Sequence, residues 1–246
     1  MQVSNPMRRV QRVRHELHRR EVTVSRVAPL GDSFVAVTFT GETLDGFLSA
    51  SFDDHVKFMF EDATGETIRR DYTPRHFDPA RRELTIEFAL HGDGQASTWA
   101  QRAAVGQPAV IAGPRGSMII PADYDWHLLI GDATALPAIT RRLEELSAGT
   151  RAIVLALQEG AADRRDLHSR SELQVQWLEN PDALVEAVRS LELPSGEGFA
   201  WGAGEASIMA RVRAVLADEK GHPKEAMRVA AYWRLGVADH HEDLTA

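Results

Sequence analysis

Arginine, aromatic and hydroxyl side chains alternate in segment 70–75, which reads RDYTPR. Successive side chains of an extended strand point to opposite faces, so Arg70, Tyr72 and Pro74 can share one face. Thr73 and Arg75 then share the other. A flavin needs an aromatic surface for its ring system, a hydrogen-bond partner near atom N5 and cations for its pyrophosphate. The segment therefore predicts a flavin site, and the alternative is a basic strand end with a turn at Thr73-Pro74.

A second segment, 91–100, reads HGDGQASTWA and opens with glycines and small residues. Small residues at the start of a short helix present backbone N–H groups to a phosphate, and the helix dipole favours that anion. One predicted strand separates this segment from segment 70–75, so both can meet at one cofactor. The alternative is an ordinary loop that ends a strand and leads into a capped helix.

Two glycine-bearing turns follow predicted strands in the second half of the chain. Residues 131–134, GDAT, open a helix in which Thr134 can serve as the N-cap. Residues 201–205, WGAGE, follow a later strand. Open α/β sheets bind ligands beyond the carboxyl ends of their strands, so both turns are candidates for dinucleotide contacts. The alternative is that each turn is only a close-packed connection between a strand and a helix.

The elements that position these segments differ between the two halves of the chain. From Val22 to about Ile120, short alternating runs rich in Val, Ile, Phe and Thr are separated by Gly, Pro and Asp, as in an antiparallel barrel or sandwich. From Tyr124 onward, apolar strands alternate with helices. That alternation predicts a doubly wound parallel sheet. We expect a basic arm at 1–20, a β-barrel at 21–122 and an α/β domain at 123–246.

Composition excludes several kinds of chemistry. The 246 residues include no cysteine, so disulfides, thiol nucleophiles and cysteine-ligated clusters are excluded, and a redox centre would be an organic cofactor or a haem. The net charge of −8 argues against a general nucleic-acid binder. No apolar run approaches the roughly 18 residues of a membrane span, and the N-terminus lacks the apolar core of a secretory signal. We expect a cytoplasmic protein without stable membrane association.

Charged and histidine-bearing segments leave alternatives open. Residues 8–20 hold six arginines against a single Glu16, which suits either a solvated arm or a surface that attracts an anionic ligand. Arg164 and Arg165 follow the second predicted parallel strand, where they could bind a 2′-phosphate or belong to a solvated loop. The ten histidines show no reliable metal-ligand spacing, and His240-His241 in the acidic tail is only a weak candidate. We expect no resident metal site.

Segments 70–75 and 91–100 together resemble the siderophore-interacting proteins, a branch of the ferredoxin-reductase-like flavoproteins. The family shows R-x-Y-T-x-R and then H-G-x-x-G-x-A-x-x-W. Gln95 stands where the family commonly has proline. The likeness covers residues from about 20 to 237 and continues in HVKFMF (55–60), GPRG (113–116), GDATALPAI (131–139), WGAGEAS (201–207) and YWRLG (232–236).

The resemblance implies FAD and NAD(P)H as cofactors and assigns roles by position. Tyr72 would stack on the isoalloxazine ring, and Thr73 would place its hydroxyl or backbone N–H near N5. Arg70 and Arg75 would face the phosphates or the flavin edge, while the backbone at Gly94, Ala96 and Ser97 would hold the pyrophosphate. The remaining cofactor-binding residues it implies are His91, Gly92, Trp99, Gly131, Asp132, Ala133, Thr134, Trp201, Gly202, Gly204 and Glu205. Tyr72 and Thr73 are the expected catalytic residues.

The resemblance also implies a ferric siderophore as the substrate. It makes Lys57 a candidate contact for an anionic ferric chelate, with Arg115 and Arg234 as weaker companions. The expected reaction is FAD-dependent reduction of siderophore-bound iron by NAD(P)H. The alternatives are a ferric-siderophore carrier without catalysis and a general flavin or ferric reductase fed by another electron donor. The choice between NADH and NADPH, the siderophore and the oligomeric state stay open.

Overall fold

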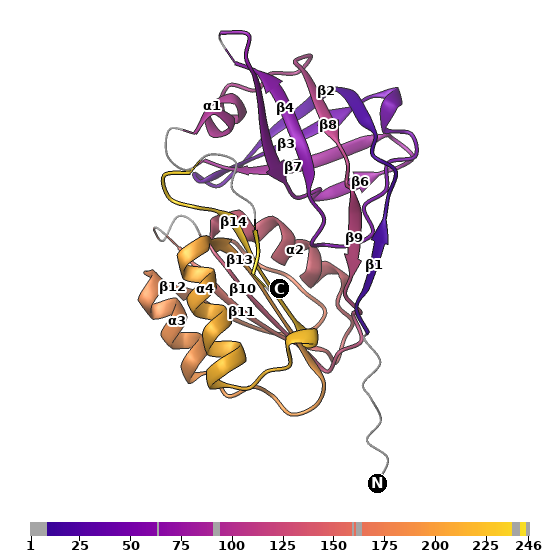
Figure 1. Cartoon of the computed structure of the whole chain (residues 1–246). Helices are drawn as coiled ribbons and strands as arrows, with labels where there is room; N and C mark the ends of the chain where they lie inside the picture. Colours follow the sequence, from indigo (N-terminus) through magenta and orange to yellow (C-terminus); the bar gives the residue numbers. More distant parts are fainter. Residues whose placement is uncertain are drawn as a thin grey trace.

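A computed structural model describes residues 9–62, 64–90, 94–158, 160, 164–237 and 242–244. An antiparallel barrel is followed by a domain in which helices cover both faces of a mainly parallel sheet (Figure 1). No helix in these described ranges is both long and apolar enough to cross a membrane. The expected order, a barrel and then a doubly wound α/β domain, is confirmed.

The barrel is a seven-stranded sheet with the order β5-β4-β8-β2-β3-β7-β6, and all its neighbours are antiparallel. Alternate residues face the interior, as at Val22 and Val24, because side chains in a strand alternate between its faces. The strands are β2 (Arg19–Leu30), β3 (Phe34–Thr40), β4 (Val56–Glu61), β5 (Thr67–Tyr72), β6 (His76–Asp78), β7 (Glu83–Ala89) and β8 (Pro108–Ala112).

Segment 70–75 links the two edges of this sheet. The edge strands β5 and β6 lie at opposite ends of the strand order, yet only Thr73, Pro74 and Arg75 separate them along the chain. The N–H of Arg75 donates to the carbonyl of Thr85 in β7, at 2.9 Å. The proposed flavin segment is therefore held at the seam of the barrel by backbone pairing on both sides.

The helix α1 (Gln95–Gln101) caps this barrel and is fixed by Trp99. The Trp99 ring lies 4.7 Å from the ring of Phe58 and 6.2 Å from that of Phe39, centroid to centroid. A Trp in such a cluster contributes a large buried apolar area. Its packing sets the position of the helix whose first turn contains Ala96 and Ser97.

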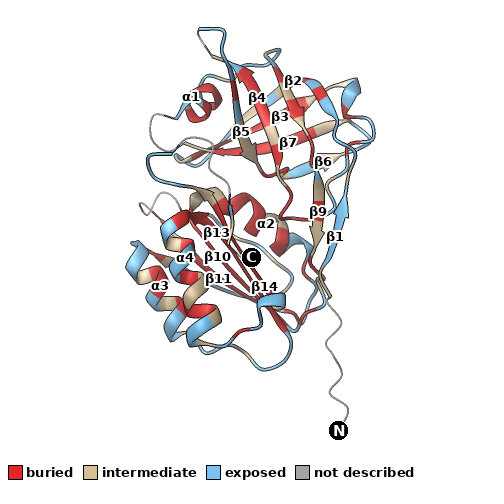
Figure 2. Cartoon of the chain, in the orientation of Figure 1, coloured by how far each residue is buried: buried red, intermediate tan, exposed pale blue. Residues whose placement is uncertain are grey.

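The second domain is built on a six-stranded sheet with the order β12-β11-β10-β13-β14-β15. Its neighbours are parallel except for the final β14–β15 pair. The strands are β10 (Trp126–Gly131), β11 (Arg151–Leu157), β12 (Glu172–Leu178), β13 (Gly198–Glu205), β14 (Met227–Trp233) and β15 (Glu242–Asp243). The burial view shows the central strands almost wholly enclosed (Figure 2), which explains their continuous apolar sequences.

Helices cover both faces of this sheet. Leu129 and Val154 pack towards α2, whereas Leu128 and Ile153 pack towards the opposite helices. Phe34 and Phe52 of the barrel belong to the same apolar cluster as the α2 face of the second sheet, so this cluster joins the two domains. The helices are α2 (Leu136–Glu145), α3 (Pro181–Ser190) and α4 (Ala206–Ala214), which continues as a π-helical turn (Val215–Glu219); 3₁₀ turns occupy Glu42–Leu44, Ala133–Ala135 and Lys224–Ala226.

Besides β6 and β15, two further short strands were not expected from the sequence pattern. β1 (Gln11–Arg14) pairs antiparallel with β9 (Gly116–Ile119), which lies inside the segment expected to be a connector. Strands of four residues are too short to show a hydrophobic periodicity, and the side chains of β1 are all exposed. The backbone of Val13 comes so close to Gly116 that a Cβ there would lie 2.4 Å from the Val13 carbonyl oxygen, so this pairing needs glycine.

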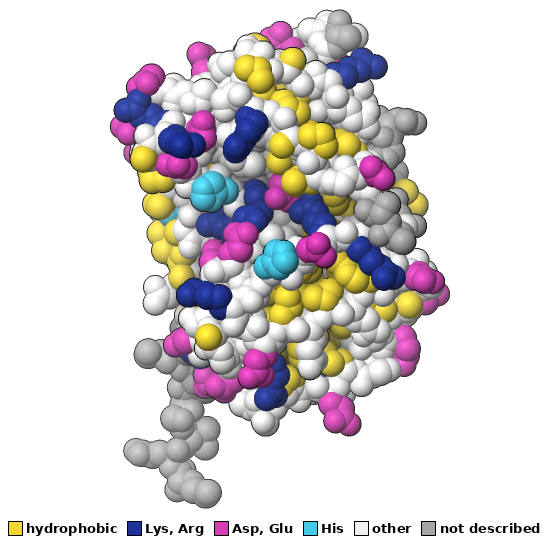
Figure 3. All heavy atoms as spheres, turned by 180° about the vertical axis from the view of Figure 1, so that it is seen from behind, with side chains coloured by type: hydrophobic (Ala, Val, Ile, Leu, Met, Phe, Trp, Pro, Cys, Tyr) yellow, Lys and Arg dark blue, Asp and Glu magenta, His cyan; other side chains and the backbone are white. Residues whose placement is uncertain are grey.

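Several arginines of the arm have partners within the chain. Arg9 pairs with Asp123 and Glu197 of the second domain, and its guanidinium lies over the ring of Tyr124. Arg12 lies 3.6 Å from Asp243, while Arg20 is buried and donates to the carbonyl of Gly113. Basic and acidic side chains are interspersed on the face seen in Figure 3. Much of the arm's charge is therefore used in holding the arm to the body of the protein.

Candidate functional site

An open cleft lies between the barrel and the carboxyl ends of β10 and β14. It encloses about 1150 Å³ of empty space, with the solvent at its mouth included. The cleft brings together predicted residues from both domains. They are Arg70, Tyr72, Thr73, Gly94, Ala96, Ser97, Ala133 and Thr134.

Tyr72 and Thr73 form one wall of the cleft. The Tyr72 ring lies 4.4 Å from the ring of Phe88 and 5.9 Å from that of Phe58, centroid to centroid, while another part of Tyr72 lines the cleft. Burial raises the pKa of Tyr72, so its hydroxyl stays protonated at neutral pH. Thr73 is buried and shares a side-chain hydrogen bond with Tyr232 of β14.

The adjacent wall is suited to a phosphate group. The Ser97 Oγ atom is buried and has no hydrogen-bond partner among the described residues. A Cβ placed on Gly94 would meet nothing closer than Ser97 Cβ at 4.0 Å, so the backbone here faces open space. Arg70 reaches Gln95 Oε1 at 3.3 Å and makes no ion pair within the described ranges. An unused hydroxyl, accessible backbone and a cation fit the pyrophosphate of FAD.

Arg75 has a different setting from Arg70. Its guanidinium lies 3.1 Å from Glu87 and 2.5 Å from Glu144 of α2. Arg165 approaches the same Glu87 at 2.5 Å and stacks over the ring of Phe34. Arg75 is thus committed to a network of ion pairs between the domains, and Arg165 belongs to that network rather than to a solvated loop.

Asp132 organises the part of the cleft formed by the second domain. Its Oδ1 atom accepts from the N–H and the hydroxyl of Thr134, at 2.9 and 2.6 Å. Its Oδ2 atom accepts from the N–H of Glu205 at 2.9 Å and from Trp233 Nε1 at 2.8 Å. The expectation that Thr134 is the N-cap is wrong: Asp132 caps the 3₁₀ turn that leads into α2, because its carboxylate is the acceptor.

Gly131 and Gly204, one in each turn, are needed for close packing. A Cβ on Gly131 would lie 2.3 Å from Ala135 Cβ, and one on Gly204 would lie 2.6 Å from Asp132 Oδ2. Glu205 caps α4 by accepting from the N–H groups of Ser207 and Ile208. These contacts agree with the alternative that each turn is a close-packed connection between a strand and a helix. They also shape the edge of the sheet at which Ala133 and Thr134 line the cleft.

Trp201 and Gly202 are buried in the sheet below this edge. The indole of Trp201 donates to Asp53 Oδ1 at 2.8 Å, and Asp53 also accepts from Arg228 at 2.5 Å. Because Asp53 belongs to the barrel side, Trp201 joins the domains. Neither Trp201 nor Gly202 is among the described residues that line the cleft.

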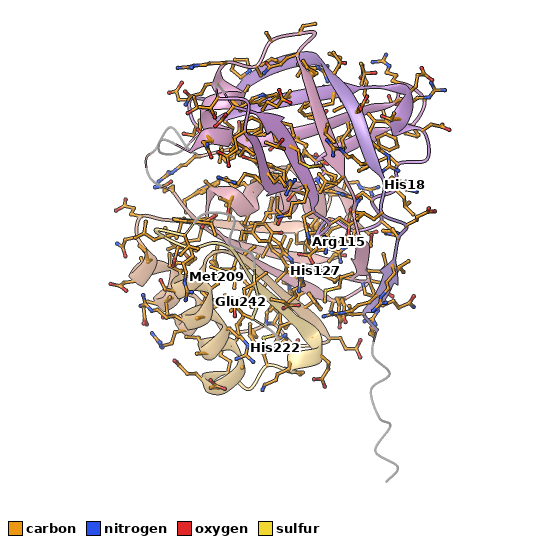
Figure 4. The ribbon with its side chains drawn as sticks, turned by 45° about the horizontal axis from the view of Figure 1, so that its top comes forward. His18, Arg115, His127, Met209, His222 and Glu242 are labelled. Carbon is orange, nitrogen blue, oxygen red and sulfur yellow. The ribbon has the colours of Figure 1, made fainter. Side chains whose placement is uncertain are left out.

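The three predicted substrate contacts are not grouped together. Lys57 Nζ donates to Asp71 Oδ2 at 3.0 Å, and Asp71 lines the cleft. Arg115 lies beside the N-terminal arm, where its carbonyl accepts from the N–H of His15 (Figure 4). Arg234 is exposed just beyond β14. Of the three, Lys57 is therefore the one tied to a residue of the cleft.

Sequence reasoning missed several residues of the cleft. Tyr232 and Trp233 appear in the sequence analysis only within the YWRLG segment, Asp71 only within RDYTPR, and Gln95 only as a departure from the family pattern. The place of Tyr232 and Trp233 in the cleft depends on the docking of β14 against the barrel, for which a single sequence has no local signal. The other described lining residues are Phe34, His55, Glu87, Ala89, Pro137 and Val237. His91, Gly92 and the pair His240-His241 lie outside the described residues.

Comparisons with known proteins agree with this architecture. Residues 23–69 and 61–118 match the siderophore-interacting FAD-binding domain, and residues 124–236 match the siderophore-interacting protein model. The NADPH-dependent ferric-chelate reductase of Escherichia coli is 34% identical over 94% of this chain and 99% of its own length. The ferric vibriobactin reductase of Vibrio cholerae is 27% identical over 86% of this chain and 88% of its own.

A solved structure matches the whole arrangement. The siderophore utilization protein from T. fusca is 30% identical and superimposes with a TM-score of 0.89, covering 94% of this chain and 98% of that chain. Family models account for both domains, and a relative above 30% identity spans nearly all of the sequence. The chain belongs to the siderophore-interacting protein family and contains its FAD-binding domain.

Proposed function

We propose that this protein uses NADPH and FAD to reduce the iron of a ferric siderophore, so that Fe(II) is released. The observation that carries the proposal is the cleft in which Arg70, Tyr72 and Ser97 of the barrel face Thr134 of the second domain. Relatives named as an NADPH-dependent ferric-chelate reductase and a ferric vibriobactin reductase support the reaction and the choice of NADPH.

The barrel residues would bind and orient FAD. Arg70 and the Ser97 hydroxyl would hold its pyrophosphate, together with backbone N–H groups at the start of α1. Tyr72 would provide the aromatic surface for the ring system, held in place by Phe58 and Phe88. Thr73 would supply the polar contact near N5. Bound FAD would convert a two-electron hydride donor into one-electron delivery to Fe(III).

The second domain would position the nicotinamide dinucleotide. Asp132 fixes Thr134, the N–H of Glu205 and the indole of Trp233 around the ends of β10 and β13. These groups would form a rigid edge for the dinucleotide at the point where parallel sheets bind ligands. In this proposal residues 21–122 form the FAD domain and 123–246 the NADPH domain, and the protein works in the cytoplasm.

The test is anaerobic oxidation of NADPH by purified, FAD-loaded protein, with and without a ferric siderophore, followed by trapping of Fe(II). We expect the flavin absorbance to bleach with NADPH and to return on addition of the ferric complex, with Fe(II) appearing in step. A protein that binds the ferric siderophore but takes up no FAD would instead be a carrier. Flavin bleaching without Fe(II) release would indicate a general flavin reductase.

A further inference from the structure

Residues 73–75, at the seam of the barrel, are each bound by a side chain of the second domain. The first of them shares a hydrogen bond with Tyr232 of β14, and the last pairs with Glu144 of α2. Between them, the carbonyl of Pro74 accepts from Nη1 of Arg141, also on α2, at 2.9 Å. The second domain therefore holds the segment that carries the proposed contact to flavin N5.

The guanidinium of Arg141 joins two backbone carbonyls of the barrel. Besides the Pro74 carbonyl, Nη1 reaches Ser49 Oγ at 2.8 Å, and Nη2 donates to the Ser49 carbonyl at 3.0 Å. Nε lies 3.4 Å from Glu145, one turn further along α2, and the Arg141 side chain is only 16% exposed. Because a guanidinium is planar and rigid, this clamp of Arg141 between Ser49 and Pro74 sets the spacing of the two carbonyls.

The Ser49 end of the clamp is anchored in the barrel. Ser49 Oγ donates to Asp54 Oδ2 at 2.9 Å, and the same carboxylate oxygen accepts from Ser117 Oγ of β9 at 2.7 Å and from the N–H of Ser51 at 3.1 Å. Asp54 itself is only 2% exposed. One end of the clamp is thus fixed in a buried polar cluster, and the guanidinium holds Pro74 against that support.

Holding the Pro74 carbonyl also restricts Thr73. The peptide unit that follows Pro74 is bound at both of its polar groups: its C=O accepts from Arg141, and its N–H, that of Arg75, donates to the Thr85 carbonyl at 2.9 Å. The proline ring locks φ of Pro74, and the preceding peptide bond is planar. Fixing the unit after Pro74 therefore also fixes the plane that contains the Thr73 carbonyl.

We propose that Arg141 is a positioning residue for flavin reduction: by holding the Pro74 carbonyl against Ser49, it keeps Thr73 where the contact to flavin N5 needs it. This inference rests on the proposed reaction with FAD and NADPH, and it assigns a role in the flavin site to a residue of the other domain. A displacement of about 1 Å in a positioned group can slow a reaction roughly a hundredfold. Arg141 can therefore control the flavin without touching it.

Hydrogen exchange in the FAD-free protein tests the clamp without any cofactor. Arg141→Met keeps the apolar stem and removes the donors, so the N–H of Arg75 should exchange roughly tenfold faster because its peptide unit opens more often. Arg141→Lys keeps one donor and should restore part of the protection. Mass spectrometry compares peptides that cover residues 72–76 with peptides from β3, which separates a local change from global unfolding.

Flavin reduction then tests the positioning role. In FAD-saturated Arg141→Met the limiting rate of bleaching by NADPH should fall roughly tenfold or more, while the NADPH concentration for half-maximal rate changes less than about twofold. The affinity for FAD should change little, because Arg70 and Ser97 in the phosphate-binding wall keep their places. Arg141→Lys should give a rate between those of Arg141→Met and the wild type.

Arg142, the next residue of α2, provides the matched control. It too donates to a proline carbonyl, that of Pro121 at 2.5 Å, and it pairs with Glu145 at 3.2 Å, but Pro121 lies in the connector between the domains. Arg142→Met should lower the stability of the fold and leave both the exchange at residues 73–75 and the bleaching rate unchanged. Arg142→Lys serves the same purpose if Arg142→Met does not fold.

Three results would overturn the inference. Unchanged exchange at Arg75 in Arg141→Met would mean that the clamp does not hold this segment, and faster exchange with an unchanged bleaching rate would leave Arg141 a purely structural role. Equal slowing of bleaching in Arg142→Met would show that any weakening of α2 has the same effect. Failure of the proposed function would look different, because the wild type would then release no Fe(II), whereas the exchange comparison needs neither FAD nor siderophore.

Discussion

The side chains of Thr73 and Tyr232 share a hydrogen bond across the two domains. Thr73 lies at the seam of the barrel, and Tyr232 lies near the end of β14. Burial raises the pKa of Tyr232 well above its ordinary value, so its hydroxyl keeps its proton at any physiological pH. One hydroxyl donates to the other, and the pair retains hydrogen-bonding capacity for a ligand in the cleft.

Loss of either hydroxyl should weaken this connection between the domains. Tyr232→Phe leaves the buried Thr73 hydroxyl without this partner, so the free energy of unfolding should fall by about 1–3 kcal/mol. Urea unfolding measures this loss of stability.

Thr73→Val should slow flavin bleaching by NADPH about tenfold in FAD-saturated protein if its hydroxyl serves N5. Stopped-flow absorbance measures the bleaching rate.

A double-mutant cycle measures the interaction between the two hydroxyls apart from their contacts with other residues. If the two hydroxyls interact, the Thr73→Val and Tyr232→Phe effects on stability should not add, and the coupling should be about 0.5 kcal/mol or more. Strictly additive losses would contradict the contact. An unchanged bleaching rate in Thr73→Val would show that its backbone N–H, rather than its hydroxyl, serves the flavin.

Ser97 should matter for the cofactor and not for the fold. Its Oγ atom is buried without a partner among the described residues, so Ser97→Ala removes an unsatisfied group and should leave the stability of the FAD-free protein equal or higher. A lost charge-assisted hydrogen bond to phosphate should weaken FAD binding roughly tenfold. Fluorescence titration with FAD, beside thermal unfolding of the FAD-free protein, checks both effects. Equal FAD affinity in the variant would mean that Ser97 does not contact the pyrophosphate.

Glu87 should be important for stability. It is nine-tenths buried between Arg75 and Arg165, so Glu87→Gln leaves two guanidinium groups without their shared anion. The free energy of unfolding should fall by about 3 kcal/mol, as is typical when one partner of a buried pair is removed. Glu42→Gln is the matched control. The Glu42 side chain is 90% exposed, so its ion pair with Arg82 should contribute at most about 1 kcal/mol to stability. Similar losses in both variants would contradict the assignment.

Much of the fold could be predicted because its strands carry local signals. The period-two pattern of β2 and the continuous apolar run of β10 each reflect the burial that the structure shows. The apolar positions Leu136, Ile139 and Leu143 were correctly placed on the buried face of α2. The strands β1 and β9 were not predicted because paired segments of only four residues are too short to show a comparable pattern.

Only the site residues that lie within short sequence motifs could be predicted. Arg70, Tyr72 and Ser97 lie within short segments whose residue types suit one cofactor, and they do line one cleft. Tyr232 and Glu144 come from the second domain and meet the barrel seam only after the domains dock, while Glu87 comes from β7 of the barrel, twelve residues further along the chain than Arg75. No spacing in a single sequence indicates such a contact, and so Arg75 was expected at the phosphates rather than in an ion-pair network.

His127 gives the stability of the protein a specific dependence on pH. Burial, together with the charge of Arg142, lowers the pKa of His127 to about 3, so the folded protein keeps this ring neutral. Figure 4 marks the position of His127. The unfolded chain binds a proton at its ordinary pKa near 6.5. Between these two values the unfolded state therefore holds more protons than the folded state, and stability falls as the pH falls.

Removing His127 should remove this part of the acid sensitivity. As the pH is lowered from 7.5 to 5.5, this one ring should cost the wild type about 1.4 kcal/mol, since one pH unit below 6.5 is crossed. In His127→Phe, which keeps a buried aromatic ring beside Tyr124, the difference between the two pH values should shrink by that amount. Urea unfolding at both pH values makes the comparison, with His18→Gln as the control because the His18 side chain is 51% exposed. If His127→Phe lost as much stability on acidification as the wild type, protonation of this ring would not oppose folding.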